Sequence, residues 1–121
     1  FNKIDLECIL TNFHLNSLSS LRKSKNSKKT ITLHYWHSDC TLHLAFKDNG
    51  IGIPENKLDE VFEPFKFGEN NNSRSKDVHG RGLGLHLVKK IVDRYGGQIK
   101  AIKTATGAKI ELSIPGIKRV T

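Results

Sequence analysis

The stretch HGRGLGLHLV, which runs from His79 to Val88, has glycine at three alternate positions immediately before apolar residues with helical spacing. Leu85, Val88 and Val92 predict an amphipathic helix that the paired glycines at 96–97 end. Glycines placed this way indicate either a flexible loop or a backbone that comes close to another group, and a helix N-terminus favours a phosphate there. The rest of the chain decides between these two interpretations.

Four short segments with alternating polar and apolar residues predict β-strands. The first two, around Ile31–Tyr35 and Leu42–Phe46, lie on either side of HSDC and indicate a β-hairpin. The other two, around Ile99–Ile102 and Ile110–Ile114, flank TATG and indicate a second hairpin. Because these connections are short, we expect each hairpin to be antiparallel, within a sheet that is mixed but mostly antiparallel.

Two more helical segments complete the predicted fold. Apolar residues at helical spacing run from Asp5, the expected N-cap, to Arg22, and Pro54 is suited to start a short helix that extends through Glu60–Phe62. Helices and antiparallel strands in blocks predict an α+β fold, a two-layer α/β sandwich with the helices on one face of the sheet. Residues 66–79 are polar and lack periodicity, which predicts a mobile loop.

A length of 121 residues and a net charge of +8 describe one basic domain, residues 1–121, with a basic tail at 116–121. No apolar run approaches the ~18 residues that span a bilayer, and no leader sequence is evident, so we expect a soluble segment without a membrane span. The basic residues lack interleaved aromatic residues, so nucleic acid is not an expected ligand. Cys8 and Cys40 lack metal-ligand spacing and are expected to be reduced.

Three features are suited to a nucleotide. Asn12 and Asn16 lie on one face of the first predicted helix, and an amide oxygen is a neutral ligand for Mg²⁺. Asp48, in the glycine turn DNGIGIP, can accept a hydrogen bond from an exocyclic amine, and the turn leaves room for a flat ring. The Gly80–Gly84 turn offers backbone N–H groups to an anion. Each feature alone has an ordinary structural explanation, but their combination predicts a nucleotide site.

In order and spacing, these motifs resemble the N, G1, F and G2 boxes of the ATP-binding catalytic domain of sensor histidine kinases. The matching segments are NFHLN from Asn12, DNGIGIP from Asp48, FEPF from Phe62 and GRGLGL from Gly80, and the likeness extends over about residues 5–115. That family belongs to the Bergerat-fold superfamily with the gyrase, heat-shock-90 and mismatch-repair ATPases. The resemblance therefore implies the Bergerat fold, with ATP and Mg²⁺ as cofactors.

The resemblance implies a role for each matching position. Asn16 would hold Mg²⁺ and Asn12 would support the same phosphate-side cluster, so these two are the candidate catalytic residues. Asp48 would read the adenine amino group. An ATP lid, residues 66–79, would be anchored by two aromatic residues and followed by phosphate-facing backbone. The candidate cofactor-binding residues are Asn12, Asn16, Ser19, Ser20, Asp48, Gly50, Gly52, Ile53, Phe62, Phe65, Gly80, Arg81, Gly82, Leu83, Gly84 and Leu85.

Asn12 separates two activities within the superfamily. The ATPases have a glutamate four residues before the metal-binding asparagine as a general base, and this chain has Asn12 at that position. The resemblance therefore implies transfer of the γ-phosphoryl group to a histidine in preference to hydrolysis. A serine kinase of the anti-sigma-factor type, and a non-catalytic module that binds nucleotide or a partner protein, are the alternative functions.

Some positions depart from the family pattern. Ser19 and Ser20 stand where many members have a basic and an aromatic residue, and Lys109 lies near a frequent threonine. The corresponding phosphate and adenine contacts are therefore either missing or supplied by other residues. The basic candidates for this replacement are Lys66, Arg74, Lys76 and Arg81.

None of the six histidines lies in an acidic helical phosphoacceptor motif. The resemblance therefore implies that the phosphorylated histidine lies on a separate dimeric helical domain of the same parent kinase, with a response regulator acting downstream through the parent protein. It describes a cytoplasmic catalytic domain of two-component signalling, which can also be the cytoplasmic part of a membrane-bound sensor.

Overall fold

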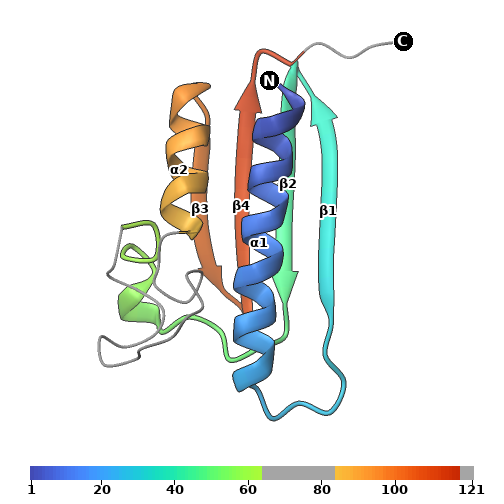
Figure 1. Ribbon diagram of the computed structural model, residues 1–121, viewed down its shortest axis with the longest axis vertical. Helices are drawn as coiled ribbons and strands as arrows, with labels where there is room; N and C mark the ends of the chain where they lie inside the picture. The colour runs from blue at the N-terminus through green and yellow to red at the C-terminus, as the bar shows by residue number, and fades with distance from the viewer. Residues whose placement is uncertain (64–83, 118–121) are drawn as a thin grey trace.

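The computed structural model describes residues 1–63 and 84–117 of the chain. The elements follow the order α1 (Lys3–Lys23), β1 (Ile31–Ser38), β2 (Thr41–Asp48), the 3₁₀ turn η1 (Glu55–Lys57), α2 (Gly84–Arg94), β3 (Gln98–Lys103) and β4 (Ala108–Pro115). Both long helices lie on the same face of the sheet, α1 in front of β2 and β4 and α2 beside β3 (Figure 1). This arrangement is the predicted two-layer α+β sandwich.

The four described strands form one sheet in the order β1-β2-β4-β3. Each of the three pairings is antiparallel, so the described sheet has no parallel pair. The cross-strand pairs Leu44–Leu112 and Phe46–Ile110 place buried side chains on the helix-covered face. Asp39 and Cys40 have φ values of 52° and 59°, which suits the tight turn of the first hairpin and confirms its prediction.

The helix α1 begins earlier than the sequence pattern predicts. Asn2 is its N-cap, and the Asn2 side chain accepts a hydrogen bond of 2.8 Å from the backbone N–H of Asp5. The prediction that Asp5 caps this helix is therefore wrong, because Asp5 lies in the first turn, where its negative charge suits the helix dipole. The buried row of α1 recurs every fourth residue and consists of Ile9, Phe13, Ser17 and Leu21.

The helix α2 ends as predicted. Gly96 has a φ of +74°, and the N–H of Gly97 donates to the carbonyl oxygen of Val92 at 2.9 Å, which closes the helix with a glycine C-cap. The helix predicted after Pro54 is shorter than expected. It forms only the single turn η1, and hydrogen-bonded turns continue from there to Glu63.

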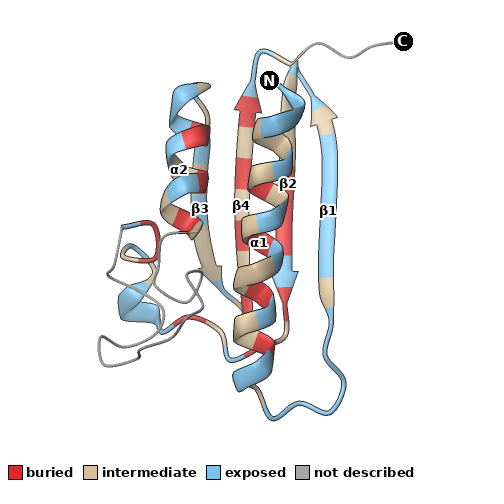
Figure 2. Cartoon of the chain, in the orientation of Figure 1, coloured by how far each residue is buried: buried red, intermediate tan, exposed pale blue. Residues whose placement is uncertain are grey.

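Burial is uneven across the sheet. The central strands β2 and β4 carry most of the buried strand residues, whereas β1 is largely exposed (Figure 2). We call the side of the sheet away from α1 and α2 the helix-free face. On this face the Trp36 and His43 rings stack, with 4.9 Å between the ring centroids and 5° between the ring planes. Among the described residues, no helix is long and apolar enough to cross a membrane.

Candidate functional site

Asp48 is the last residue of β2 and is one of the most enclosed polar residues of the described chain, at 4% exposed. Its Oδ2 accepts a hydrogen bond of 3.0 Å from the Ser17 hydroxyl. Its Oδ1 accepts a bond of 2.9 Å from the N–H of Gly50 and a longer one, 3.4 Å, from the Ser20 hydroxyl. The carboxylate is thus fixed by α1 on one side and by its own glycine turn on the other.

The glycines of the turn are required by close backbone contacts. A Cβ atom at Gly50 would lie 2.1 Å from the Ser20 Oγ and 2.7 Å from the Ser20 carbonyl carbon. A Cβ atom at Gly107, in the β3–β4 turn, would lie 2.1 Å from the carbonyl oxygen of Asp48. Gly52 has a φ of +80°, which side chains disfavour. The turn after β2 is therefore held between α1 and the β3–β4 turn.

Asn49 connects this turn to the segment between α1 and β1. Its Oδ1 accepts from the N–H of Thr30, its Nδ2 donates to the carbonyl of Lys28, and both distances are 2.8 Å. The Asn26 side chain donates to the Asn49 carbonyl oxygen at 2.7 Å. Asn49 was not among the predicted site residues, and its role here is to hold the backbone that carries Asp48.

Asn12 and Asn16 lie one helical turn apart on α1 and differ in their contacts. The Asn12 Nδ2 donates to the Cys8 carbonyl at 2.8 Å, and its Oδ1 lies so close to Gly84 that a Cβ there would be 2.9 Å away. The Asn16 amide is half-buried and makes no hydrogen bond within the described part of the chain. Asn12 thus contacts the start of α2, and the Asn16 oxygen is available to a ligand.

The N-terminus of α2 provides the second half of the candidate site. The helix starts at Gly84, has eleven residues and carries no acidic side chain in its first turn, so its dipole favours an anion. Leu85 is buried in the core at 3% exposed. The Nδ1–H of His86 donates to the carbonyl oxygen of Phe62 at 3.2 Å, which ties the helix to the segment after η1.

The other predicted cofactor-binding residues fall into four groups. Ile53 and Phe62 belong to the hydrophobic core, and Ser20 bonds to Asp48. Ser19 is half-buried and has no hydrogen bond among the residues that the structure describes. Their contacts with a nucleotide remain predictions. The predicted positions that lie outside the described residues are Phe65, the lid 66–79, Gly80, Arg81, Gly82 and Leu83.

Ser17 is the site residue that sequence reasoning missed. It is 2% exposed and donates to Asp48, so it contacts the central residue of the candidate site. The signal was present in the sequence, because Ser17 continues the four-residue spacing of Ile9 and Phe13 and Leu21 completes it. A serine in such a row is buried and needs a polar partner. The neighbouring apolar residue of α1, Leu18, is 38% exposed.

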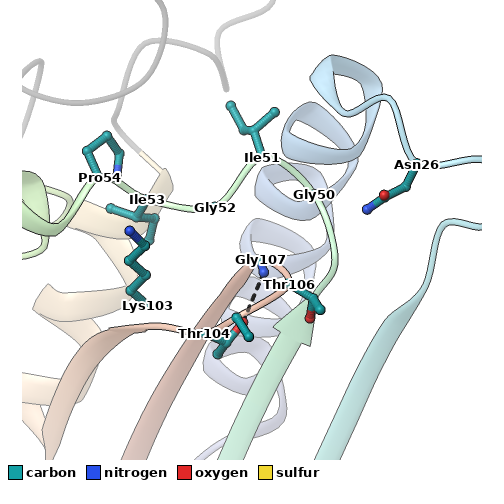
Figure 3. A pocket seen from close by; sticks show the side chains of 11 residues that line it. Asn26, Gly50, Ile51, Gly52, Ile53, Pro54, Lys103, Thr104, Thr106 and Gly107 are labelled. Atoms are coloured by element: carbon teal, nitrogen blue, oxygen red, sulfur yellow. Dashed lines mark hydrogen bonds between the residues drawn. The ribbon is translucent and has the colours of Figure 1, made fainter.

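An open cavity of about 500 Å³ lies between the glycine turn and the β3–β4 turn (Figure 3). Its polar lining includes Asn26, Lys103, Thr104 and Thr106, and the Thr104 hydroxyl accepts from the N–H of Gly107 at 3.0 Å. Asn12, Asn16 and Asp48 are not among its lining residues. Of the predicted cofactor-binding residues, Gly50, Gly52 and Ile53 do line the cavity.

Comparisons with known proteins agree with this geometry. A family model described as histidine kinase-, DNA gyrase B-, and HSP90-like ATPase matches residues 2–117. Sensor protein RprX of Bacteroides fragilis is 33% identical over 115 residues, 93% of this chain and 22% of that protein. Sensor protein kinase WalK of Staphylococcus haemolyticus is 30% identical over 118 residues, 95% of this chain and 19% of that protein. This chain thus spans about a fifth of these two relatives.

The solved structure of the mycobacterial sensor histidine kinase MprB has a TM-score of 0.75 to this chain at 26% identity. The match covers 98% of this chain and 77% of the MprB chain. The catalytic domain of histidine kinase ThkA has the same TM-score at 22% identity, covering 97% of this chain and 71% of the ThkA chain. The fold of the described residues is therefore the fold of histidine kinase catalytic domains.

Proposed function

Because the chain belongs to the family of histidine kinase-, DNA gyrase B- and HSP90-like ATPases, we propose that it is the ATP-binding catalytic domain of a sensor histidine kinase. It binds Mg-ATP and transfers the γ-phosphoryl group to a histidine on a separate helical phosphoacceptor domain of the parent protein. A response regulator then receives the signal. The proposed location of this domain is the cytoplasm.

The position of Asp48 is the observation that carries this proposal. Its carboxylate is buried, and three donors orient it at the end of a strand, next to a turn whose glycines present no side chains. An oriented carboxylate with an unfilled acceptor position suits the exocyclic amine of adenine.

The phosphate end of the proposed site combines Asn16 with the N-terminus of α2. A single neutral amide oxygen fits Mg²⁺, which retains most of its waters and takes few protein ligands. When bound, Mg²⁺ neutralises charge on the phosphates. The first backbone N–H groups of α2, which starts at Gly84, favour the same phosphates through the helix dipole.

Asn12 supports phosphoryl transfer over hydrolysis. An amide cannot take a proton from water, so this position supplies no general base. Its Nδ2 is also committed to the Cys8 carbonyl, which holds the side chain against α1. Catalysis by this domain then depends on the positioning of ATP against an incoming histidine and on charge neutralisation.

Calorimetry with a non-hydrolysable ATP analogue tests the binding step. We expect binding in the presence of Mg²⁺ and a marked loss of affinity in the presence of a chelator, because Asn16 would hold the metal and the metal would neutralise charge on the phosphates. No heat at millimolar analogue would reject the nucleotide site and favour a module that binds only a partner protein.

Labelled ATP tests the transfer step. The chain is mixed with the remaining segments of its parent protein, and the phosphorylated product is treated with acid. Acid-labile phosphohistidine on a helical domain is the expected result, together with slow release of inorganic phosphate. Acid-stable phosphoserine on a partner protein would favour the serine kinase, and binding without any transfer would favour the non-catalytic module.

A further inference from the structure

We infer that Ser17 is a positioning residue that orients the Asp48 carboxylate toward the 6-amino group of adenine. The inference deepens the proposed function and rests on it. Ser17 does not touch the nucleotide in this scheme. It acts through Asp48, and thereby contributes to the recognition of adenine over purines that lack the amino group.

The first argument is the burial of Ser17. It is the only polar side chain in the buried row of α1, and it is 2% exposed. The Asp48 Oδ2, at 3.0 Å, is the hydrogen-bond partner of its hydroxyl in the described residues. An apolar residue could fill this position without a hydrogen-bond partner, whereas a buried hydroxyl needs one. For the Ser17 hydroxyl that partner is the Asp48 carboxylate.

The second argument is a count of acceptor positions. A carboxylate offers about four lone-pair sites, two on each oxygen. The Gly50 N–H and the Ser20 hydroxyl occupy both sites on Oδ1, and the Ser17 hydroxyl occupies one site on Oδ2. One acceptor site on Oδ2 remains open among the described contacts. A single amino group with one hydrogen pointing at the carboxylate fills it.

The third argument concerns rotation. The terminal bond of an aspartate side chain is a soft torsion, so the carboxylate plane is set by its hydrogen bonds. The bond from Ser20 is long, at 3.4 Å, and the bond from Gly50 reaches only Oδ1. Ser17 therefore makes the close contact that fixes Oδ2, the oxygen that keeps an open acceptor site.

Comparison of two nucleotides tests the inference. The affinities of ATP and of purine riboside triphosphate, which lacks only the 6-amino group, are measured by calorimetry in the native chain, in Ser17→Ala and in Ser17→Cys. We expect Ser17→Ala to lose about tenfold in ATP affinity and less than about twofold in affinity for the purine analogue. Ser17→Cys keeps the side-chain size with a weaker donor and should lie between. It also carries the test if the alanine variant does not fold.

Ser113→Ala is the matched control, because it makes the same chemical change on the helix-free face of β4. It should leave both affinities unchanged. Equal losses for the two nucleotides in Ser17→Ala, or no loss, would overturn the positioning role. A native chain that binds neither nucleotide, or that does not prefer ATP, would instead overturn the proposed function and its assignment of Asp48.

Discussion

Asp48 is held by contacts within the fold and is also the proposed base reader, and a conservative substitution separates these two roles. Asp48→Asn keeps the size of the side chain but replaces one acceptor oxygen with a donor. It should weaken ATP binding roughly tenfold to a hundredfold, because a mispaired buried polar group costs ~1–3 kcal/mol. Calorimetry gives the affinity, and thermal unfolding shows whether the variant is folded. A folded variant with native ATP affinity would reject Asp48 as the base reader.

Asp39→Asn provides the matched control for Asp48→Asn. Asp39 is exposed in the β1–β2 turn with a φ of 52°, a conformation that asparagine adopts easily. The substitution removes the same negative charge at a distance from the site. It should leave ATP affinity unchanged, so any loss in this control would indicate a general charge effect.

Position 50 requires glycine because a side chain there would collide with Ser20, and not because of its backbone conformation. Gly50→Ala would place a methyl group 2.7 Å from the Ser20 backbone, so α1 and the turn must separate. We expect a loss of about 1–3 kcal/mol in the free energy of unfolding, measured by urea denaturation. Gly116→Ala is the contrasting variant. Its φ of +77° is unfavourable for a side chain, but no atom lies within 4 Å of the Cβ that the substitution adds. A cost at Gly116 that exceeds the cost at Gly50 would contradict this argument.

At the scale of elements, the start of α1 is tied to the end of α2. The Tyr95 hydroxyl donates to Asp5, Arg94 lies 3.5 Å from the same carboxylate, and the Phe1 ring meets Tyr95 edge-on at 5.0 Å. Tyr95→Phe should therefore lower the melting temperature. The hydrogen bond to Asp5 also raises the pKa of Tyr95 above its usual 10.0, so the stabilisation is present below pH 10 and is lost as the pH rises through the raised value.

Melting curves of the native chain and Tyr95→Phe at pH 7 and at increasing pH values above 10 test this tie. The difference between the two should be greatest at pH 7 and should shrink in alkali. A difference that grows in alkali, or native stability of the variant at pH 7, would show that the hydroxyl does not join the helices.

The strands β3 and β4 carry an ion-pair cluster on the helix-free face. The Glu111 carboxylate lies 2.9 Å from Lys109 and 3.7 Å from Lys100, and the hydrogen bond from Lys109 lowers its pKa below the usual 4.5. A carboxyl group whose pKa is lowered by folding stabilises the fold at pH values above its unfolded-state pKa. This stabilisation is lost as the pH falls through its folded-state pKa. Glu111→Gln should cost less than about 1 kcal/mol at pH 7, because the pair is partly solvated.

Urea denaturation of the native chain and Glu111→Gln, from pH 7 down to below 4.5, measures this contribution. The gap in the free energy of unfolding should close in acid. Glu7→Gln on the exposed side of α1 controls for loss of one carboxylate. A gap that persists in acid would mean that Glu111 contributes through packing and not through its charge.

At the scale of the whole molecule, the sequence pattern predicted most of the architecture. Alternation in the strands and periodicity in the helices come from which face is buried, so both hairpins, both long helices and the glycine C-cap of α2 could be predicted. The order of the motifs also indicated the family. Local patterns are strong wherever one element has one buried face.

Features that depend on distant partners could not be predicted in this way. Two of the three donors to Asp48, Ser17 and Ser20, lie about thirty residues earlier in the chain. The segment after α1 has no hydrophobic pattern, yet the Lys29 ammonium donates to the Leu21 carbonyl at 2.8 Å, and Asn49 holds the backbone nearby. Such contacts form only in the packed fold, and the periodicity of apolar residues along the sequence does not predict them.

The stacked Trp36 gives this molecule a built-in optical probe. It is the single tryptophan of the chain, and it lies on the helix-free face, opposite to Asp48 and α1. We therefore expect its fluorescence emission to report whether the β1–β2 hairpin is formed, and we expect a nucleotide at the proposed site, on the helix side of the sheet, to leave the emission of the folded chain unchanged. Unfolding of this hairpin can thus be followed on an unlabelled sample, and the rise in stability on adding nucleotide then reports its affinity.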